Sequence, residues 1–151
     1  MSESCTCGPK RQVVLHVTLS RDDLPCGVCG ARVPLDRVTG PREAIHLVRR
    51  WVDEAFAIEM LWFASGDYAA WAKGELDGPK SKVNTLGRQA AQKMSAAAPT
   101  WLYFAPHAEA RQAIDKYLDH CPACHAPTEP TGLIPKYGLG CSKCRVAGSA
   151  E

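Results

Sequence analysis

Apolar side chains recur at intervals of three and four positions between Ala44 and Trp62, with Val48, Trp51 and Ile58 among them. This period predicts an amphipathic helix with one face in the core. Pro41 suits the first turn of that helix, because a proline at this place loses no hydrogen bond. The sequence therefore predicts a long helix that begins close to this proline.

The second half of the predicted helix, Ala55 to Ala64, is apolar at nearly every position. A helix that is apolar all round is covered on several sides, and we expect this half to be covered in that way. Glu59 is the exception, and it either pairs with a buried cation or lies on the one face of the helix that is exposed to solvent. It has no second carboxylate or nucleophile at a convincing spacing, so we do not expect it to act as a catalytic acid.

Two further helices follow. Gly66 interrupts the pattern, Asp67 can cap a short helix, and Tyr68 and Trp71 are expected to return to the core. Residues 78–98 then predict a second long helix, which Pro99 ends. Its inward residues are Val83, Leu86, Ala90 and Met94, and Lys82, Arg88 and Lys93 face water.

Period-two and β-branched runs predict a few short strands. Arg11 to Ser20 ("RQVVLHVTLS") is expected to form a strand, and Thr100 to Phe104 ("TWLYF") is a second run that can pair with it. Residues 34–41, rich in proline and glycine, predict an irregular connection. Residues 108–120 are expected to be helical and to lead into the last cysteines.

All eight cysteines fall into four close pairs, and none is left over. Two Cys-x-x-Cys turns brought together by a hairpin supply the four thiolates of a tetrahedral zinc site. The first and second pairs are 18 residues apart and the third and fourth are 16 apart, which suits two short strands and a turn. The sequence thus predicts two zinc ribbons, with the strand at 11–20 in the first. The predicted ligands are Cys5, Cys7, Cys26 and Cys29 in one and Cys121, Cys124, Cys141 and Cys144 in the other.

Three alternatives bear on these cysteines. Disulfides would form if the protein were exported, and a Cys-x-x-Cys pair can be a redox-active dithiol, although no βαβ pattern surrounds any pair here. The third alternative is that the ribbons are purely structural, and it is favoured because four thiolates leave zinc no open position. Cys5-x-Cys7 is the rarer type of turn and lies near an end that can fray.

The five histidines do not add to the ligand count. His120 and His125 adjoin cysteines, and either could replace a thiolate or support one by a hydrogen bond, but with four cysteines present we expect neither to ligate. His16, His46 and His107 are expected to be surface or internally satisfied side chains.

Composition sets the class of the chain. Its 151 residues are 46% hydrophobic with a net charge of +2, which fits one compact core and lacks the concentrated basic character of a dedicated nucleic-acid binder. The segment 41–78 has 4 basic and 7 acidic residues, and 79–120 has 6 basic and 3 acidic. No secretory signal and no run of the ~18 apolar residues that a membrane span needs is visible, so we expect a cytoplasmic protein.

We therefore expect an α+β protein: a small helical core with short strands and one zinc ribbon near each terminus. The expected domains are an N-terminal ribbon (1–40), a helical core with a strand near 100–104 (41–120) and a C-terminal ribbon (121–151). Two zinc ions are the expected cofactors.

Several stretches resemble a bacterial family of domains of unknown function, described as containing a zinc ribbon, with nucleic-acid binding as its suggested activity. They are "PCGVCGARVPLDRV", "AIEMLWFASGDYAAWAKGEL", "LGRQAAQKMSAAAPTWLYF", "CPACHAP" and "YGLGCSKCRV", in the family's order, and they cover most of residues 25–146. The resemblance implies a bacterial, cytoplasmic, zinc-binding protein.

Three classes of function follow. The first is a nucleic-acid-associated adaptor, and the second is a module that binds a partner protein, such as an immunity or antitoxin-like protein. The third, an enzyme, is not expected: no glycine-rich phosphate loop, Ser-His-Asp set or open zinc motif is present, and no small-molecule substrate is evident. The residues that could contact phosphates are Lys80, Lys82, Arg88, Lys93, Lys136, Lys143 and Arg145.

Overall fold

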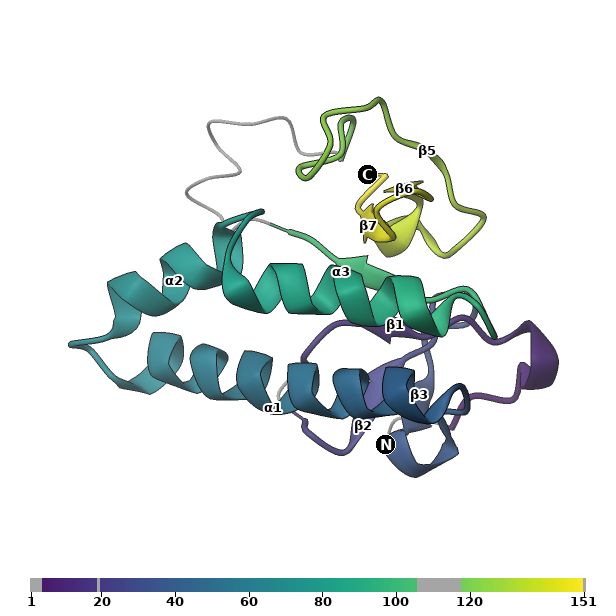
Figure 1. Cartoon of the computed structure of the whole chain (residues 1–151), viewed down its shortest axis with the longest axis horizontal. Coiled ribbons are helices and arrows are strands. Elements are labelled where there is room, and N and C mark those ends of the chain that lie inside the picture. The colour runs from purple at the N-terminus through teal and green to yellow at the C-terminus, as the bar shows by residue number, and fades with distance from the viewer. Residues whose placement is uncertain (1–3, 19, 106–117, 151) are drawn as a thin grey trace.

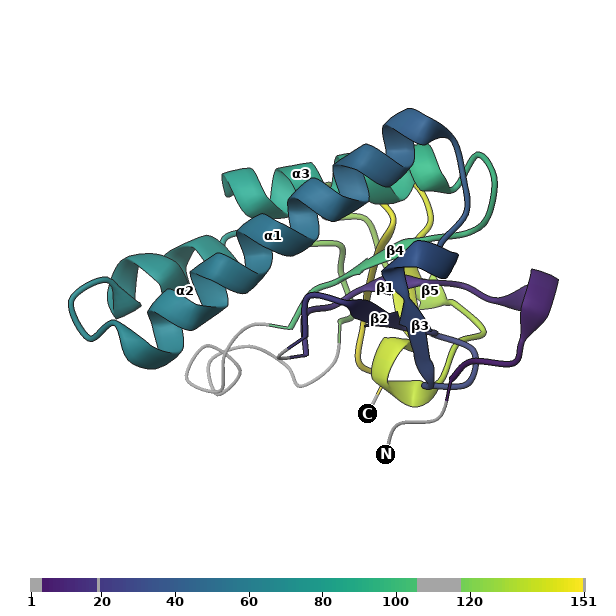
Figure 2. The same ribbon diagram turned by 90° about the horizontal axis from the view of Figure 1, so that it is seen from below.

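The computed structural model describes residues 4–18, 20–105 and 118–150. In this part of the chain, a layer of helices lies against one side of a mixed sheet (Figures 1 and 2), which confirms the expected α+β class. The helices are α1 (Arg42–Ala64), α2 (Ala69–Asp77) and α3 (Lys82–Met94). Short 3-10 turns span Gly8–Lys10, Leu35–Arg37 and Pro135–Tyr137.

The main sheet has five short strands in the order β1-β4-β7-β6-β5. They are β1 (Val14–Leu15), β4 (Trp101–Tyr103), β5 (Glu129–Pro130), β6 (Leu139–Cys141) and β7 (Val146–Gly148). β1 and β7 pair in parallel with the two edges of β4, whereas β7, β6 and β5 pair antiparallel. A separate antiparallel hairpin joins β2 (Asp23–Pro25) and β3 (Arg32–Pro34).

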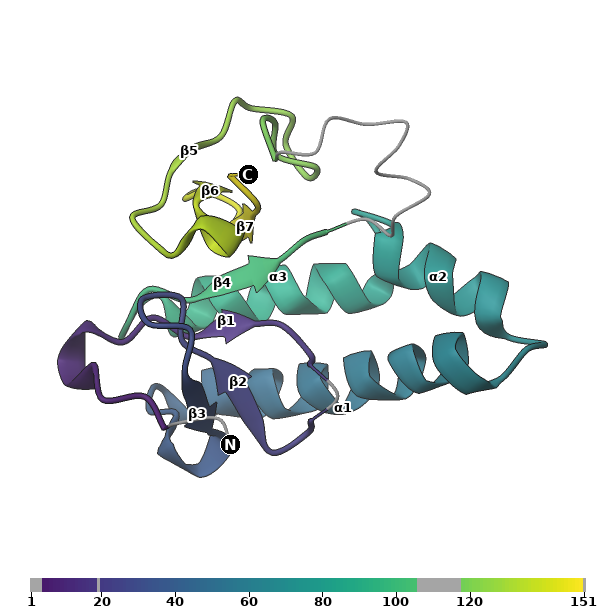
Figure 3. The ribbon, with the colours of Figure 1, turned by 180° about the vertical axis from the view of Figure 1, so that it is seen from behind.

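Strand β4 therefore joins the two ends of the sequence, as Figure 3 shows for β1 and β4. The predicted pairing of the 100–104 segment with the N-terminal strand is confirmed. The place of the 11–20 segment in the first ribbon is corrected: the ribbon hairpin is β2–β3, and Val13 reaches it by a single bridge to Cys26. Both residues of β1 are instead buried in the main sheet: Leu15 packs in the core with the helices, and Val14 packs in a second cluster with Trp101 and Tyr137.

Helix α1 is buried along its first half only. Its buried residues are Ala44, Val48, Trp51, Val52 and Ala55. From residue 56 to 64 no side chain is fully buried, and Phe63 is 59% exposed. The expected cover on several sides is only partial in the described structure. Helix α1 extends past the sheet (Figure 2), although Phe56 and Ile58 still pack against the core, Arg21 lies over the Phe56 ring, and α2 packs along the helix.

The connection between α1 and α2 also differs from expectation. Tyr68 and Trp71 were expected in the core but are 62% and 54% exposed, and α2 buries Ala72 instead. Asp67 does not cap the helix, since Ser65 Oγ accepts the hydrogen bond from the Tyr68 amide at 2.8 Å. Pro41 is the N-cap residue of α1 rather than part of its first turn.

Helix α3 follows its predicted pattern. Val83, Leu86, Ala90 and Met94 are all buried, and the helix ends at Met94, before the predicted end at Pro99. Ser81 caps it by accepting from the Asn84 amide, and the buried Asn84 side chain donates to the carbonyls of Leu76 and Gly78. These bonds fasten the end of α2 to the start of α3. The helix predicted over 108–120 lies largely outside the described residues.

Within the described residues, no helix has the length and apolar character needed to cross a membrane.

Candidate metal centres

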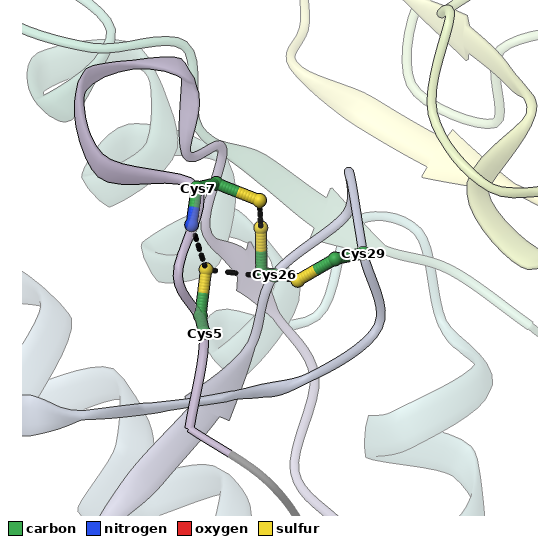
Figure 4. A group of neighbouring side chains, drawn as sticks. All are labelled: Cys5, Cys7, Cys26 and Cys29. Carbon is green, nitrogen blue, oxygen red and sulfur yellow. Dashed lines mark hydrogen bonds between the residues drawn. The ribbon is translucent and has the colours of Figure 1, made fainter.

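The N-terminal centre is built from two segments that meet at the β2–β3 hairpin (Figure 4). Cys26 and Cys29 lie in the hairpin turn, and Cys5 and Cys7 lie on the incoming chain. The Cys5 amide donates to the carbonyl of Arg32 on β3 at 2.9 Å, which fixes that chain beside the hairpin. The Sγ atoms of Cys5 and Cys29 are 3.6 Å apart, and those of Cys7 and Cys26 are 4.0 Å apart.

The C-terminal centre has the same plan and is more deeply placed. Cys121 and Cys124 lie in the turn enclosed by a bridge between residues 120 and 127, and Cys141 and Cys144 lie in the turn between β6 and β7. The Sγ atoms of Cys124 and Cys141 are 3.8 Å apart. Three of its cysteines are buried, whereas the N-terminal centre has one buried cysteine and an exposed Cys29.

The sulfur positions fit one tetrahedral ion in each group. In each group, the four Sγ atoms all lie within 4.8 Å of one another. A tetrahedron with metal–sulfur bonds of about 2.3 Å has edges of about 3.8 Å, and the measured 3.6, 3.8 and 4.0 Å bracket that length. A disulfide requires about 2.05 Å, and all eight cysteines are free thiols. The two groups can therefore each hold a metal ion.

The three Cys-x-x-Cys turns share one backbone conformation. The carbonyl of the first cysteine accepts a hydrogen bond from the amide four residues later, at 2.7, 2.8 and 2.7 Å for Cys26, Cys121 and Cys141. In each turn that fourth residue has a positive φ. The turn conformation points both sulfurs into one concavity, as the sequence spacing predicted. The residues with positive φ are Gly30 (77°), His125 (65°) and Arg145 (61°).

The thiols of the N-terminal centre differ in acidity. Burial raises the pKa of Cys26, but hydrogen bonds with the backbone of Cys29, Gln12 and Val28 outweigh it, and the pKa falls to about 7. The pKa of Cys7 is raised to about 12, chiefly by its hydrogen bond with Cys29 and also by burial. The centre thus combines one thiol that ionises near neutral pH with one that retains its proton.

The C-terminal centre repeats this division. Hydrogen bonding to the backbone of Ala126 lowers the pKa of Cys124 to about 7, and burial raises the pKa of Cys144 to about 12. A second thiolate beside the first is repelled, which keeps the remaining thiols protonated. A divalent cation removes this repulsion and releases the protons, so each group is disposed to bind a cation.

The histidines in the described structure lie outside both groups. His120 and His125 are exposed, and His120 Nδ1 lies 3.5 Å from a carboxylate oxygen of Asp119. His16 was expected to be either a surface or an internally satisfied side chain, and it is the second. Its Nδ1 lies 2.8 Å from the Tyr137 hydroxyl. Burial, with Lys136 and Arg32 nearby, lowers its pKa to about 3. His46 is exposed, and His107 lies outside the described residues.

Three of the seven predicted phosphate-contacting residues are engaged within the protein. Arg88 donates to the carbonyl of Pro79, and Lys93 forms an ion pair with Glu43.

Arg145 is half-buried. Its guanidinium stacks 3.8 Å above the ring of Trp101, and its Nε donates to the Thr100 carbonyl at 3.0 Å. The other four candidates are exposed. They are Lys80, Lys82, Lys136 and Lys143. Lys136 Nζ also lies 5.7 Å from the centre of the Tyr103 ring.

Sequence reasoning missed a contact between the two centres. The amide of Ile134 donates to the carbonyl of Gly27, inside the first cysteine turn, at 2.8 Å. The side chain of Leu133 lies so close that a methyl group on Gly27 would meet it at 2.9 Å. The loop before β6 therefore packs directly against the cysteine turn of the N-terminal centre. The sequence signal for this close contact was Gly27 itself, because a glycine in the turn lets another segment approach its backbone.

Comparisons with protein-family models, with curated proteins and with solved structures gave no match. The resemblance to the bacterial zinc-ribbon family therefore stays a prediction.

Proposed function

We propose that each four-cysteine group binds one Zn²⁺ and that both ions are structural. The observation that carries this proposal is the tetrahedral spacing of the sulfurs in both groups. Tetrahedral sets of four thiolates are typical of zinc or iron. An iron–sulfur cluster puts inorganic sulfide between its thiolates, which sulfurs this close together do not allow. Four protein ligands leave zinc no place for substrate, which favours a non-enzymatic role.

Metal analysis of protein purified without added metal tests this proposal. We expect two equivalents of zinc and a colourless protein, whereas mononuclear iron would give visible absorption. A stoichiometry near one would mean that Cys5 and Cys7 do not complete the first centre. Thiolate ligands need a reducing compartment, and we accordingly place the protein in the cytoplasm of a bacterium, as the resemblance implies.

We infer that the protein works by binding another protein, in the manner of an immunity or antitoxin-like module. Phe63, Tyr68 and Trp71 support this inference, because each is more than half exposed although aromatic residues concentrate binding energy at interfaces. Isothermal titration against proteins encoded beside its gene tests the inference. Saturable 1:1 binding by the zinc-loaded protein is expected.

A nucleic-acid-associated adaptor is the second candidate. Gln92, near the end of α3, donates to the carbonyl of Lys143 in the last cysteine turn, so basic residues of the helix and of the ribbon belong to adjoining surfaces. Gel shifts at low salt test this candidate. Four exposed lysines can neutralise only a few phosphates, so binding would be weak and would fall steeply with salt. No shift of DNA or RNA at low salt would exclude it.

A further inference from the structure

The far half of α1 and the start of α2 carry apolar surface that the described structure leaves open. We call Phe63, Tyr68 and Trp71 the hairpin tip, since they lie at or next to the α1–α2 connection. This connection extends beyond the sheet, at the opposite end of the helical layer from the 3-10 turn that follows the first cysteines (Figure 1). Three aromatic rings that are each more than half exposed leave roughly 300 Å² of apolar surface, and patches of that size on a monomer are often functional.

The backbone beside the tip is also accessible. Gly74 follows Trp71 by one turn within α2, and a methyl group placed on it would have no atom within 4 Å. A glycine inside a helix costs about 1 kcal/mol relative to alanine. Nothing within the described molecule requires this glycine. Its lack of a side chain lets an approaching partner reach the helix backbone next to the aromatic rings.

The charge around the tip selects the partner. Two acidic residues adjoin the tip, and one of them, Asp67, is exposed. Asp67 directly precedes Tyr68, and Glu75 lies one helical turn after Trp71. Asp67 and Glu75 therefore lie beside the apolar surface, and we call them the acidic surround. Charges of opposite sign complement one another across interfaces.

This surround disfavours three other occupants. A second copy of the chain, docked tip to tip, would bring like charges together. Nucleic acid and anionic lipid would be repelled for the same reason. The apolar area of one tip is also well below the roughly 800 Å² per partner that a standard stable interface buries. What remains is a protein segment that supplies both apolar side chains and positive charge.

We propose that the hairpin tip is a docking surface for a cationic amphipathic segment of another protein. The proposal rests on the inferred protein-binding function and names its surface. The aromatic rings of the tip contact the apolar side chains of that segment, and the carboxylates of the surround face its lysines or arginines. Phe63, in the part of α1 that its sequence predicts to be covered, obtains its cover from this partner.

A defined peptide probe tests the proposal with the full-length, zinc-loaded protein. The probe is a fluorescently labelled amphipathic helix of leucine and lysine, and its control has glutamate in place of lysine. We expect fluorescence anisotropy to show binding of the lysine peptide alone, with weaker binding at high salt. Trp71→Ser is expected to weaken the affinity about tenfold and Trp71→Phe to restore most of it. Asp67→Asn is expected to weaken it, and Asp36→Asn, at an exposed carboxylate beside the first hairpin, is the matched control that leaves it unchanged.

Several outcomes would overturn the proposal. One is equal binding of the two peptides, and another is undiminished binding by Trp71→Ser. A third is a dimer in solution that Trp71→Ser dissociates, which would make a second copy the occupant. A fourth is protection of Trp71 from acrylamide quenching in the free monomer, judged against Trp71→Phe, because the chain would then cover its own tip. Zinc content and circular dichroism of each variant are measured in parallel, so failure of the docking surface is distinguished from failure of the zinc-stabilised fold.

Discussion

At three positions the backbone turns through the left-handed region directly after a cysteine pair. Gly30 does so without steric cost, whereas His125 and Arg145 carry a Cβ there. A left-handed residue with a side chain costs roughly 1–2 kcal/mol. Arg145 gains from its stack on Trp101, but His125 is exposed and has no comparable contact among those described.

We therefore expect His125→Gly to stabilise the zinc-loaded protein by roughly 0.5 kcal/mol, since glycine relieves the strain but gains entropy in the unfolded chain. Urea unfolding at saturating zinc measures this change. Ser142→Gly is the matched control, because its φ is negative and glycine there should destabilise. Equal effects of the two substitutions would show that the left-handed conformation carries no cost.

His16 illustrates how burial changes a titration. Its pKa is lowered to about 3, whereas an unfolded histidine titrates near 6.5. The folded state thus keeps His16 neutral, and the unfolded state takes up a proton as the pH falls below 6.5. The stability associated with neutral His16 is complete above that pH and is lost as the pH falls toward 3.

The prediction is that the free energy of unfolding of the wild type, relative to His16→Gln, falls by about 1 kcal/mol per pH unit between pH 6 and pH 5. The difference between the two proteins cancels the titration of the cysteines, which both share. Denaturant unfolding at the two pH values measures it. A difference that does not change with pH would mean that the His16 ring charges freely in the folded protein.

At the scale of elements, the contact between α1, α3 and β4 depends on one residue without a side chain. A methyl group on Gly87 of α3 would lie 2.7 Å from Nε1 of Trp51 and 2.7 Å from a methyl carbon of Leu102. Both neighbours are buried, so neither can move aside easily. Gly87 thus sets how closely the helix approaches the sheet.

Gly87→Ala is expected to destabilise the protein by about 1–2 kcal/mol, because overpacking of a core outweighs the better helix propensity of alanine. Gly74→Ala is the matched control on α2, where open space surrounds the new methyl group, and it should stabilise by up to about 1 kcal/mol. Thermal unfolding of both variants compares them. Stabilisation by both would show that the helix layer shifts to accommodate the new methyl group.

At the scale of the whole molecule, the two metal centres hold the fold unequally. Cys141 ends β6, which pairs with β7, and β7 pairs with β4 at the centre of the sheet. Cys5 lies on an incoming chain that contacts the β2–β3 hairpin. Loss of the C-terminal ion therefore frees strands of the main sheet. When the N-terminal ion is lost, by contrast, Leu24 and Val33 still hold the β2–β3 hairpin in the main core.

We expect Cys141→Ser to lower the melting temperature far more than Cys5→Ser. The binding free energy of a structural zinc ion is about 10–16 kcal/mol, so removal of a ligand from the C-terminal centre should cost a large part of the stability of the main sheet. Scanning calorimetry, with zinc content measured for each variant, tests the difference. Equal losses would indicate that the contact between Ile134 and Gly27 makes the two centres a single unit.

The sequence alone determined the features that depend on neighbours along the chain. The spacing of the cysteines placed all eight in two groups, and in the three Cys-x-x-Cys turns local hydrogen bonds fix the backbone that carries both sulfurs. The buried face of α3 followed from its helical period. These interactions span a few residues, so a local pattern is sufficient to specify them.

The tertiary structure decided which parts of the molecule lie together and how far the cover of each helix extends. The sequence predicted that β4 can pair with β1, but the parallel direction of that pairing and the pairing of β4 with β7 depend on contacts between distant segments. The apolar far half of α1 predicted burial, but the sheet ends before reaching it, so none of its side chains is fully buried and Phe63 is exposed. Burial depends on what the rest of the chain can cover, and hydrophobic periodicity states only which side chains favour it.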